Sequence, residues 1–222
     1  MWRRRPLVQV VGAFRSGTNA TKTCLERFYH VEVVFNRWFW KHGLPPAELN
    51  HPLPQSVPVL LLSRDPVTWA LAMHRFWRER RPELNVPGLF SDFLRQPLIV
   101  YDNTGKSCRP RFFFSSPIDY WNRYYYSWLS WGDLQPQLHC LRCEDLVADA
   151  DAWLAPLAQV ARWRLREPGP LVLPRERVGP KVSPAQVDER VLLTAEDRDW
   201  IEAAMDRKIV TRLGYERKEG GA

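Results

Sequence analysis

LVQVVGAFRSGTNATKTCLERF, from Leu7 to Phe28, is the stretch of sequence around which this chain is organised. Its first residues form a short apolar run that is typical of a buried β-strand. A turn through Gly12 and Gly17 follows, and the apolar residues after it recur at helical spacing as far as Phe28. The stretch therefore predicts a strand, a glycine loop and a helix, which is the context in which a glycine motif can bind an anion.

The loop has the Gly-x4-Gly spacing of a Walker A motif, in which main-chain N–H groups surround a phosphate. A triphosphate-binding loop continues with Lys and then Ser or Thr, but this chain has Thr18 and Asn19 instead. The cation lies inside the loop, as Arg15. These residues favour a cradle for a nucleotide that ends in a singly charged sulfuryl group and needs no magnesium. The alternative is a tight turn whose glycines bind nothing.

The composition bounds the class of protein. The chain has 222 residues, of which 45% are hydrophobic, and its formal net charge is +7. We expect one domain over residues 1–222, with a frayed tail from about 216, and an anionic partner. The sequence contains no apolar run long enough for a membrane span. The basic N-terminus lacks a cleavage pattern, so it is interpreted as the start of the first strand, not as a signal peptide.

The cysteines predict no metal centre. Cys140 and Cys143 have metal-like spacing, but there is no second pair or histidine cluster to complete a tetrahedral site. We expect Cys24, Cys108 and this pair to be buried free thiols in a reducing cytoplasm, with a redox pair as the alternative. The expected localisation is cytoplasmic.

A second arginine is expected at the same edge of the sheet as Arg15. Apolar runs predict further strands at 31–35, 57–62 and 138–142, and the run at 57–62 suits a parallel sheet covered on both faces. Arg64 follows that run, with Asp65 as N-cap and Pro66 as the first residue of a helix. Open α/β sheets bind ligands at this edge, so Arg15 and Arg64 should face one crevice.

The rest of the chain carries weaker signals. Residues 78–110 predict short helices and loops. The Gly-Lys-Ser at 105–107 lacks the first glycine of a Walker A motif and is interpreted as a chance match. Capping patterns begin an aromatic-rich helix after Ser116 and a last helix at Thr194 that should run unbroken to Gly214. The aromatic helix should supply core rings and some walls of an acceptor pocket. A further helix is expected at 151–160.

These blocks together resemble the sulfotransferases that use 3′-phosphoadenosine-5′-phosphosulfate. The similarity covers most of Leu7 to Tyr215. The matching blocks are Arg15-Ser16-Gly17-Thr18, Ser63-Arg64-Asp65-Pro66, Tyr120-Trp121-Asn122-Arg123-Tyr124, Arg142-Cys143-Glu144-Asp145-Leu146 and Leu213-Gly214-Tyr215. The resemblance implies an α/β fold, a three-layer sandwich with a central, mostly parallel sheet and a P-loop-like phosphosulfate-binding loop. The implied reaction moves a sulfuryl group to a hydroxyl or amine acceptor, by in-line transfer without a metal, and leaves adenosine 3′,5′-bisphosphate.

The resemblance also assigns residues. The loop block would bind the 5′-phosphosulfate through Arg15, Ser16, Gly17, Thr18 and Asn19, and Arg64 would bind the 3′-phosphate. A family serine that also binds this phosphate is replaced by Ala72, for which Arg177 and Lys181 are candidate substitutes. The family's Lys-x-His pattern is similar to Lys41-His42, although the two residues are adjacent here. Arg15, Lys41 and His42 are therefore the candidate catalytic residues, with His42 as base and His74 as its rival.

Several alternatives remain open at this stage. The positive charge and the aromatic content also suit a nucleotide- or nucleic-acid-binding α/β protein without sulfotransferase activity. A kinase with a modified loop is a further alternative. Residues 162–181 are either a solvated linker or a flap whose cations close on an anion. The cations cluster at strand–helix turns instead of along one stripe, which favours the sulfotransferase interpretation without nucleic acid as a partner. The acceptor, a small molecule or a glycan, is not specified.

Overall fold

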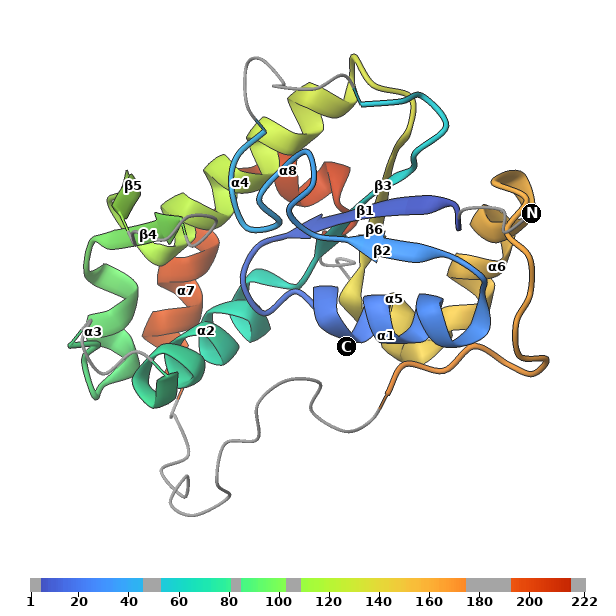
Figure 1. Ribbon diagram of the computed structural model, residues 1–222. Helices are drawn as coiled ribbons and strands as arrows, with labels where there is room; N and C mark the ends of the chain where they lie inside the picture. The colour runs from blue at the N-terminus through green and yellow to red at the C-terminus, as the bar shows by residue number, and fades with distance from the viewer. Residues whose placement is uncertain (1–4, 46–52, 81–84, 103–108, 175–192, 217–222) are drawn as a thin grey trace. The chain divides into compact units, whose positions relative to one another are not determined.

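The computed structural model describes residues 5–45, 53–80, 85–102, 109–174 and 193–216 (Figure 1). Its contacts divide the chain into two compact units. The first unit is formed from Met1–Arg64 and Ser127–Ser183, and the second from Asp65–Tyr126 and Pro184–Ala222. Each unit is described by itself below. The single domain over residues 1–222 stays a prediction.

The first unit is built on a parallel sheet. Its strands are β1 (Leu7–Gly12), β2 (Glu32–Val34), β3 (Val59–Ser63) and β6 (Leu138–Arg142). They pair in the order β2-β1-β3-β6, and every pair is parallel. The predicted α/β class with a central parallel sheet is therefore confirmed, and helices flank this sheet (Figure 1).

Three helices of this unit share one core with the sheet. They are α1 (Thr18–Phe28), α5 (Cys143–Ala148) and α6 (Ala150–Val160). The buried cluster includes Val8, Val10, Leu25, Leu60, Leu62, Leu146 and Leu154. Alternate residues of β1 and β3 enter it, as expected for strands whose side chains point to opposite faces. Each such aliphatic side chain contributes about 1.5–3 kcal/mol by leaving water.

The second unit is mainly helical. It contains α2 (Pro66–Arg80), α3 (Phe90–Arg95), α7 (Ala195–Ala204), α8 (Arg207–Arg212) and residues 117–126 of α4 (Pro117–Gly132). The predicted helix starts are confirmed. The Asp65 carboxylate accepts a hydrogen bond from the Thr68 N–H at 2.8 Å, and the Ser116 hydroxyl accepts one from the Asp119 N–H at 3.0 Å. Thr194 forms the predicted capping box with Asp197.

Two predictions for this unit are wrong. Part of the region predicted as short helices and loops forms an antiparallel hairpin, β4 (Leu98–Asp102) with β5 (Arg109–Phe114). The last helix is not continuous, because α7 ends at Ala204 and α8 begins at Arg207. Asp206 lies between them, and its carboxylate accepts hydrogen bonds from the N–H groups of Lys208 and Ile209. An N-cap at this point starts a new helix.

The aromatic residues of α4 are mostly core. Tyr120, Trp121, Tyr124, Tyr125 and Trp128 are each at most 1% exposed, whereas Tyr126 is 62% exposed. Within the second unit the Tyr120 ring packs on the rings of Trp69 and Phe114. Their assignment as core is confirmed, and a role in an acceptor pocket stays a prediction. No helix in the described part of the chain is long and apolar enough to cross a membrane.

Candidate functional site

The loop between β1 and α1 requires both of its glycines. Gly17 has a φ of 91°, and a Cβ on it would lie 3.0 Å from the Cys143 Sγ. A Cβ on Gly12 would overlap the Ser16 hydroxyl and lie 2.8 Å from the Leu62 carbonyl. Arg15 also has a positive φ, 66°, which is uncommon for a residue with a side chain. Left-handed residues in such a loop turn successive N–H groups toward one concave side, where an anion fits.

The first turn of α1 suits an anion as well. Its N-cap residue, Gly17, has no side chain that could accept from this turn, and the turn contains no acidic residue. Its leading N–H groups therefore lack the side-chain acceptor that helix starts usually have, and they carry the positive end of the helix dipole. The Ser16 hydroxyl donates to the Ala13 carbonyl at 2.7 Å, and this hydrogen bond stabilises the loop itself. Thr18 is buried and Asn19 is exposed.

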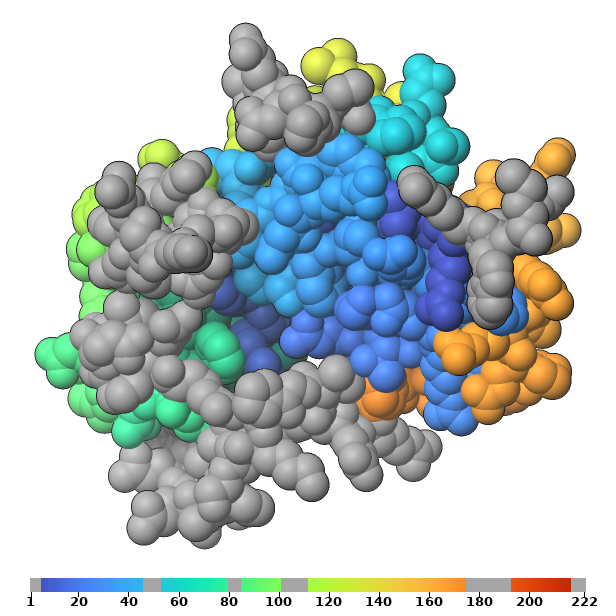
Figure 2. All heavy atoms as spheres, viewed as in Figure 1, coloured from blue at the N-terminus to red at the C-terminus, as the bar shows by residue number. Residues whose placement is uncertain are grey.

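Lys41 brings a second cation to this turn. The loop after β2 returns to β1, where the Gly12 N–H donates to the Lys41 carbonyl at 2.9 Å. The Lys41 ammonium donates to the Asn19 Oδ1 at 2.8 Å and lies 3.8 Å from the Phe35 ring centroid. Figure 2 shows residues of this loop, in lighter blue, packed on those of β1 and α1. Burial and the charge of Lys22 lower the pKa of Lys41 to about 8.

His42 is held by its Nδ1 atom. That nitrogen lies 2.7 Å from the Gly12 carbonyl oxygen, which can only accept, so Nδ1 carries a proton and the lone pair of the neutral ring is at Nε2. The imidazole stacks on Phe14 at 4.2 Å. Burial, and then the charges of Lys41 and Arg15, lower the pKa of His42 to about 3, although the bond to Gly12 opposes this shift. In the free protein His42 is therefore neutral near pH 7 but a weak base.

Arg64 lies beside the loop. It follows β3, whose residue Leu62 is paired with Gly12, and its Nη1 donates to the Arg15 carbonyl at 3.4 Å. Cys143 is a neighbour of the loop that sequence reasoning missed as a site residue, since only the fold brings it to Gly17. Burial raises the pKa of Cys143, the charge of Glu144 adds to this, and that of Arg64 opposes it.

The predicted site residues are thus brought together only in part. The carboxyl ends of β1 and β3, with the loop after β2, gather Arg15, Ser16, Gly17, Thr18, Asn19, Lys41, His42 and Arg64. Arg177 and Lys181 lie outside the described residues. His74, the rival base, is buried in α2, and its Nε2 bonds the Pro87 carbonyl at 2.8 Å. The catalytic and binding roles of all these residues stay predictions.

The cysteines differ from the prediction in one respect. Cys24 is a buried free thiol and Cys143 a half-buried one, but Cys140 is exposed. Cys140 lies on β6, which is an edge strand of the sheet. Cys108 lies outside the described residues. Among the residues that the structure describes, no group of three His, Cys, Asp or Glu side chains is placed to hold a metal ion.

Comparison with known proteins adds little to this picture. No family model matches the chain. No curated protein matches it. Among solved structures, it is similar to the crystal structure of mouse sulfotransferase SULT7A1 complexed with PAP, with 11% sequence identity and a TM-score of 0.41. That match covers 99% of this chain and 68% of the other. A likeness at this level carries no argument about function.

Proposed function

We propose that this chain is a sulfotransferase that takes a sulfuryl group from 3′-phosphoadenosine-5′-phosphosulfate. The observation that supports this best is the contact of Arg64 with the main chain of Arg15, because it brings two cations to one sheet edge beside an uncapped helix start. When bound, the nucleotide supplies the sulfuryl group and leaves as adenosine 3′,5′-bisphosphate. The glycine loop suits such an anion, because its left-handed residues Arg15 and Gly17 turn N–H groups toward one side.

In this proposal each residue has one task. Arg15, Lys41 and the first N–H groups of α1 bind the 5′-phosphosulfate, and charge-assisted hydrogen bonds of this kind contribute about 1.5–3 kcal/mol each. Gly17 and the Ser16–Ala13 hydrogen bond keep the loop in its binding conformation. Arg64 anchors the 3′-phosphate, with Arg177 and Lys181 as further candidates. Positioning and charge neutralisation of this kind are the protein's main contribution to transfer chemistry.

His42 would accept the proton of the acceptor hydroxyl at Nε2. Burial is the main cause of its low pKa, and the charges of Lys41 and Arg15 add to it; a bound polyanion would neutralise these two cations and so raise the pKa in part. General-base catalysis of this type typically contributes about 10²–10⁴-fold to a rate. We further propose that the chain is a single, cytoplasmic domain and that the transfer needs no metal.

A second candidate function is nucleotide binding without transfer. The low pKa of His42 favours it, because a base of pKa about 3 is poorly matched to a hydroxyl proton near neutral pH. The two candidates differ in one measurable property. A sulfotransferase turns over, whereas the binding protein gains stability from the nucleotide and releases no product.

The first experiment combines thermal unfolding with a transfer assay. Adenosine 3′,5′-bisphosphate should raise the melting temperature more than ATP with magnesium or single-stranded DNA does. A panel of hydroxyl and amine acceptors, with a sulfate-labelled donor, then tests transfer, and His42→Ala should reduce turnover by about 10²-fold or more. Stabilisation without transfer to any acceptor would select the binding protein. Equal stabilisation by all three ligands would contradict both candidates.

A further inference from the structure

A cavity of about 450 Å³ in the second unit is lined by residues that the proposed function does not use. Its walls come from three helices, and its size is within the range of small-molecule sites. The lining residues used below are Arg95 of α3, Ser116, Asp119 and Asn122 at the start of α4, and Trp200 and Ala204 of α7. All of them belong to the second unit.

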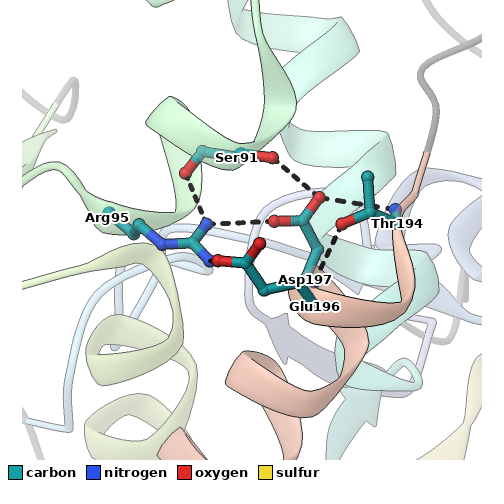
Figure 3. Close-up of polar contacts among 5 residues, drawn as sticks. All are labelled: Ser91, Arg95, Thr194, Glu196 and Asp197. Atoms are coloured by element: carbon teal, nitrogen blue, oxygen red, sulfur yellow. Dashed lines mark hydrogen bonds and ion pairs between the residues drawn. The ribbon is translucent and has the colours of Figure 1, made fainter.

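The cavity walls are held in place by hydrogen bonds between the helices. The Asn122 side chain donates to the Ala204 carbonyl at 2.8 Å and accepts from the Asp206 N–H at 3.1 Å, which joins α4 to the junction of α7 and α8. Arg95 forms an ion pair at 3.0 Å with Asp197, which is 1% exposed, and so joins α3 to α7 (Figure 3). A site whose walls are already fixed needs little ordering when a ligand binds.

The polar groups of the lining keep unused hydrogen-bonding capacity. Arg95 donates through Nη1 to Ser91 and Asp197, and through Nη2 to Glu196, which leaves two of its five N–H groups. Asn122 has used one amide hydrogen. Among the described residues, nothing accepts from the indole N–H of Trp200. The Asp119 carboxylate accepts three hydrogen bonds, from the Ser115 N–H, the Ser115 hydroxyl and Arg123. A carboxylate can accept about four.

The charges around the cavity disfavour an anionic ligand. The lining contains the cation Arg95 and the anion Asp119. Asp119 forms an ion pair with Arg123, and Arg95 forms ion pairs with Glu196 and Asp197. Two positive against three negative charges give a net charge of −1 for this group, so an anion gains nothing on entering. An apolar ligand would leave the polar lining without its hydrogen bonds to water.

Two residues of α7 add an apolar strip. Trp200 and Ala204 are four residues apart and therefore lie on one side of the helix. The Arg95 guanidinium lies 5.5 Å from the Trp200 ring centroid, and this contact restrains the indole. An aromatic surface beside planar polar side chains is complementary to a ring that has C–H faces and hydroxyl edges. We propose that this cavity binds a neutral cyclic polyol, such as one sugar unit of a glycan.

The test is saturation-transfer-difference NMR with the full-length chain and three probes: methyl glucoside, methyl galactoside and N-acetylglucosamine. At least one should receive saturation from the protein, whereas glucuronate and cyclohexylmethanol, a charged and an apolar ring, should receive little. Trp200→Ala should weaken binding about two- to tenfold, because the ligand loses its contact with the indole ring. Trp153→Ala is the matched control, since Trp153 is a partly exposed tryptophan on α6 of the first unit.

A second variant covers the case in which Trp200→Ala does not fold. Ala204→Leu narrows the cavity without removing a hydrogen bond and should also reduce saturation of the sugar. No saturation of any of the three sugars by the wild-type chain would overturn the proposal, and so would sugar signals that survive both variants. The proposal does not depend on sulfuryl transfer. Binding of adenosine 3′,5′-bisphosphate, measured on the same samples, shows which of the two has failed.

Discussion

The Arg64 guanidinium donates a hydrogen bond from Nη1 to the main-chain carbonyl of Arg15, at 3.4 Å. The two residues are 49 positions apart in the chain, but β1 and β3 are paired neighbours, so the segments that follow them emerge at the same edge of the sheet. Arg15 is in the left-handed conformation, so the chain turns sharply at the residue that Arg64 contacts. Two arginines at one edge of the sheet favour a ligand with two anionic groups.

Gly17→Ala should lower both stability and nucleotide affinity. The left-handed conformation costs a residue with a Cβ about 1–2 kcal/mol, and the new methyl group would press on the Cys143 Sγ. Urea denaturation and calorimetry with adenosine 3′,5′-bisphosphate measure the two effects. Gly88→Ala is the control, because nothing lies within 4 Å of a Cβ at Gly88. A Gly17→Ala variant that matches the control in both measurements would mean that the loop does not need its left-handed turn.

Nucleotide affinity should depend on pH through Lys41. Its pKa is about 8 in the free protein, and only the protonated ammonium attracts an anion. Affinity should therefore fall with rising pH above about 8, by up to about tenfold per pH unit, because binding must take up a proton. Calorimetry across this range should give a flat profile for Lys41→Arg, since arginine stays charged. If wild type and Lys41→Arg have the same profile, Lys41 does not contact the anion.

His42 should make the fold sensitive to acid. Its folded pKa of about 3 lies below its ordinary value of 6.5, so between these values the unfolded chain binds more protons, and the free energy of unfolding decreases as the pH falls through this window. Between about pH 6.5 and about pH 5 the loss attributable to His42 is at most about 2 kcal/mol.

His42→Asn should remove that loss, because an amide can still donate to Gly12 but does not titrate. Urea denaturation at the two pH values measures the difference. Burial also lowers the pKa values of His74 and His139, but these contribute equally to both proteins. Identical acid losses in wild type and variant would contradict the assigned environment of His42.

Asp197→Asn should strongly destabilise the second unit. Burial raises the pKa of the Asp197 carboxyl, but hydrogen bonds from Arg95, Ser91 and Thr194 outweigh this effect and hold its pKa below the ordinary value. Asp197 is buried but Arg95 is 34% exposed, so the loss should be about 1.5–3 kcal/mol, the range for hydrogen bonds to charged groups. Asp199→Asn, an exposed position on the same helix, is the control in urea denaturation. Equal midpoints and slopes for the two variants would contradict a stabilising role for the Arg95–Asp197 pair.

The stabilisation from Asp197 should also depend on pH, and it should be lost in acid. A carboxyl with a lowered folded pKa contributes its full stabilisation above its ordinary pKa of about 4. That contribution is lost as the pH falls through the lowered folded pKa. The wild-type chain should therefore approach the stability of Asp197→Asn only in strong acid.

Local signals predicted the elements on which the site stands. The apolar run before Gly12 predicted β1, and Asp65 with Pro66 predicted the start of α2. Both could be predicted because a strand or a helix cap is specified by residues close together in the chain. The continuous apolar run at 57–62 predicted a parallel sheet, although not which strands pair in it. Arg15 and Arg64 could therefore be placed at one sheet edge from sequence.

Features that depend on distant contacts could not be predicted in this way. The β4–β5 hairpin was missed because its strands lie in a region rich in Pro, Gly and charge, and are defined by pairing with each other. Cys143 reaches Gly17 only through the order of the sheet strands. The cavity residues Arg95 and Trp200 come from helices far apart in sequence. The break at Asp206 had a local signal, but a continuous apolar period across it concealed the cap.

The central claim is that Arg15 and Arg64 bind opposite ends of one doubly phosphorylated nucleotide without a metal. Calorimetry with a chelator present should compare adenosine 3′,5′-bisphosphate with adenosine 5′-monophosphate, which lacks the 3′-phosphate. Arg64→Gln should weaken the bisphosphate about 10- to 150-fold and leave the monophosphate unchanged, whereas Arg15→Gln should weaken both. Arg75→Gln, at an exposed position of α2, is the control. An unchanged bisphosphate affinity in Arg64→Gln, or an equal loss for both nucleotides, would contradict the claim.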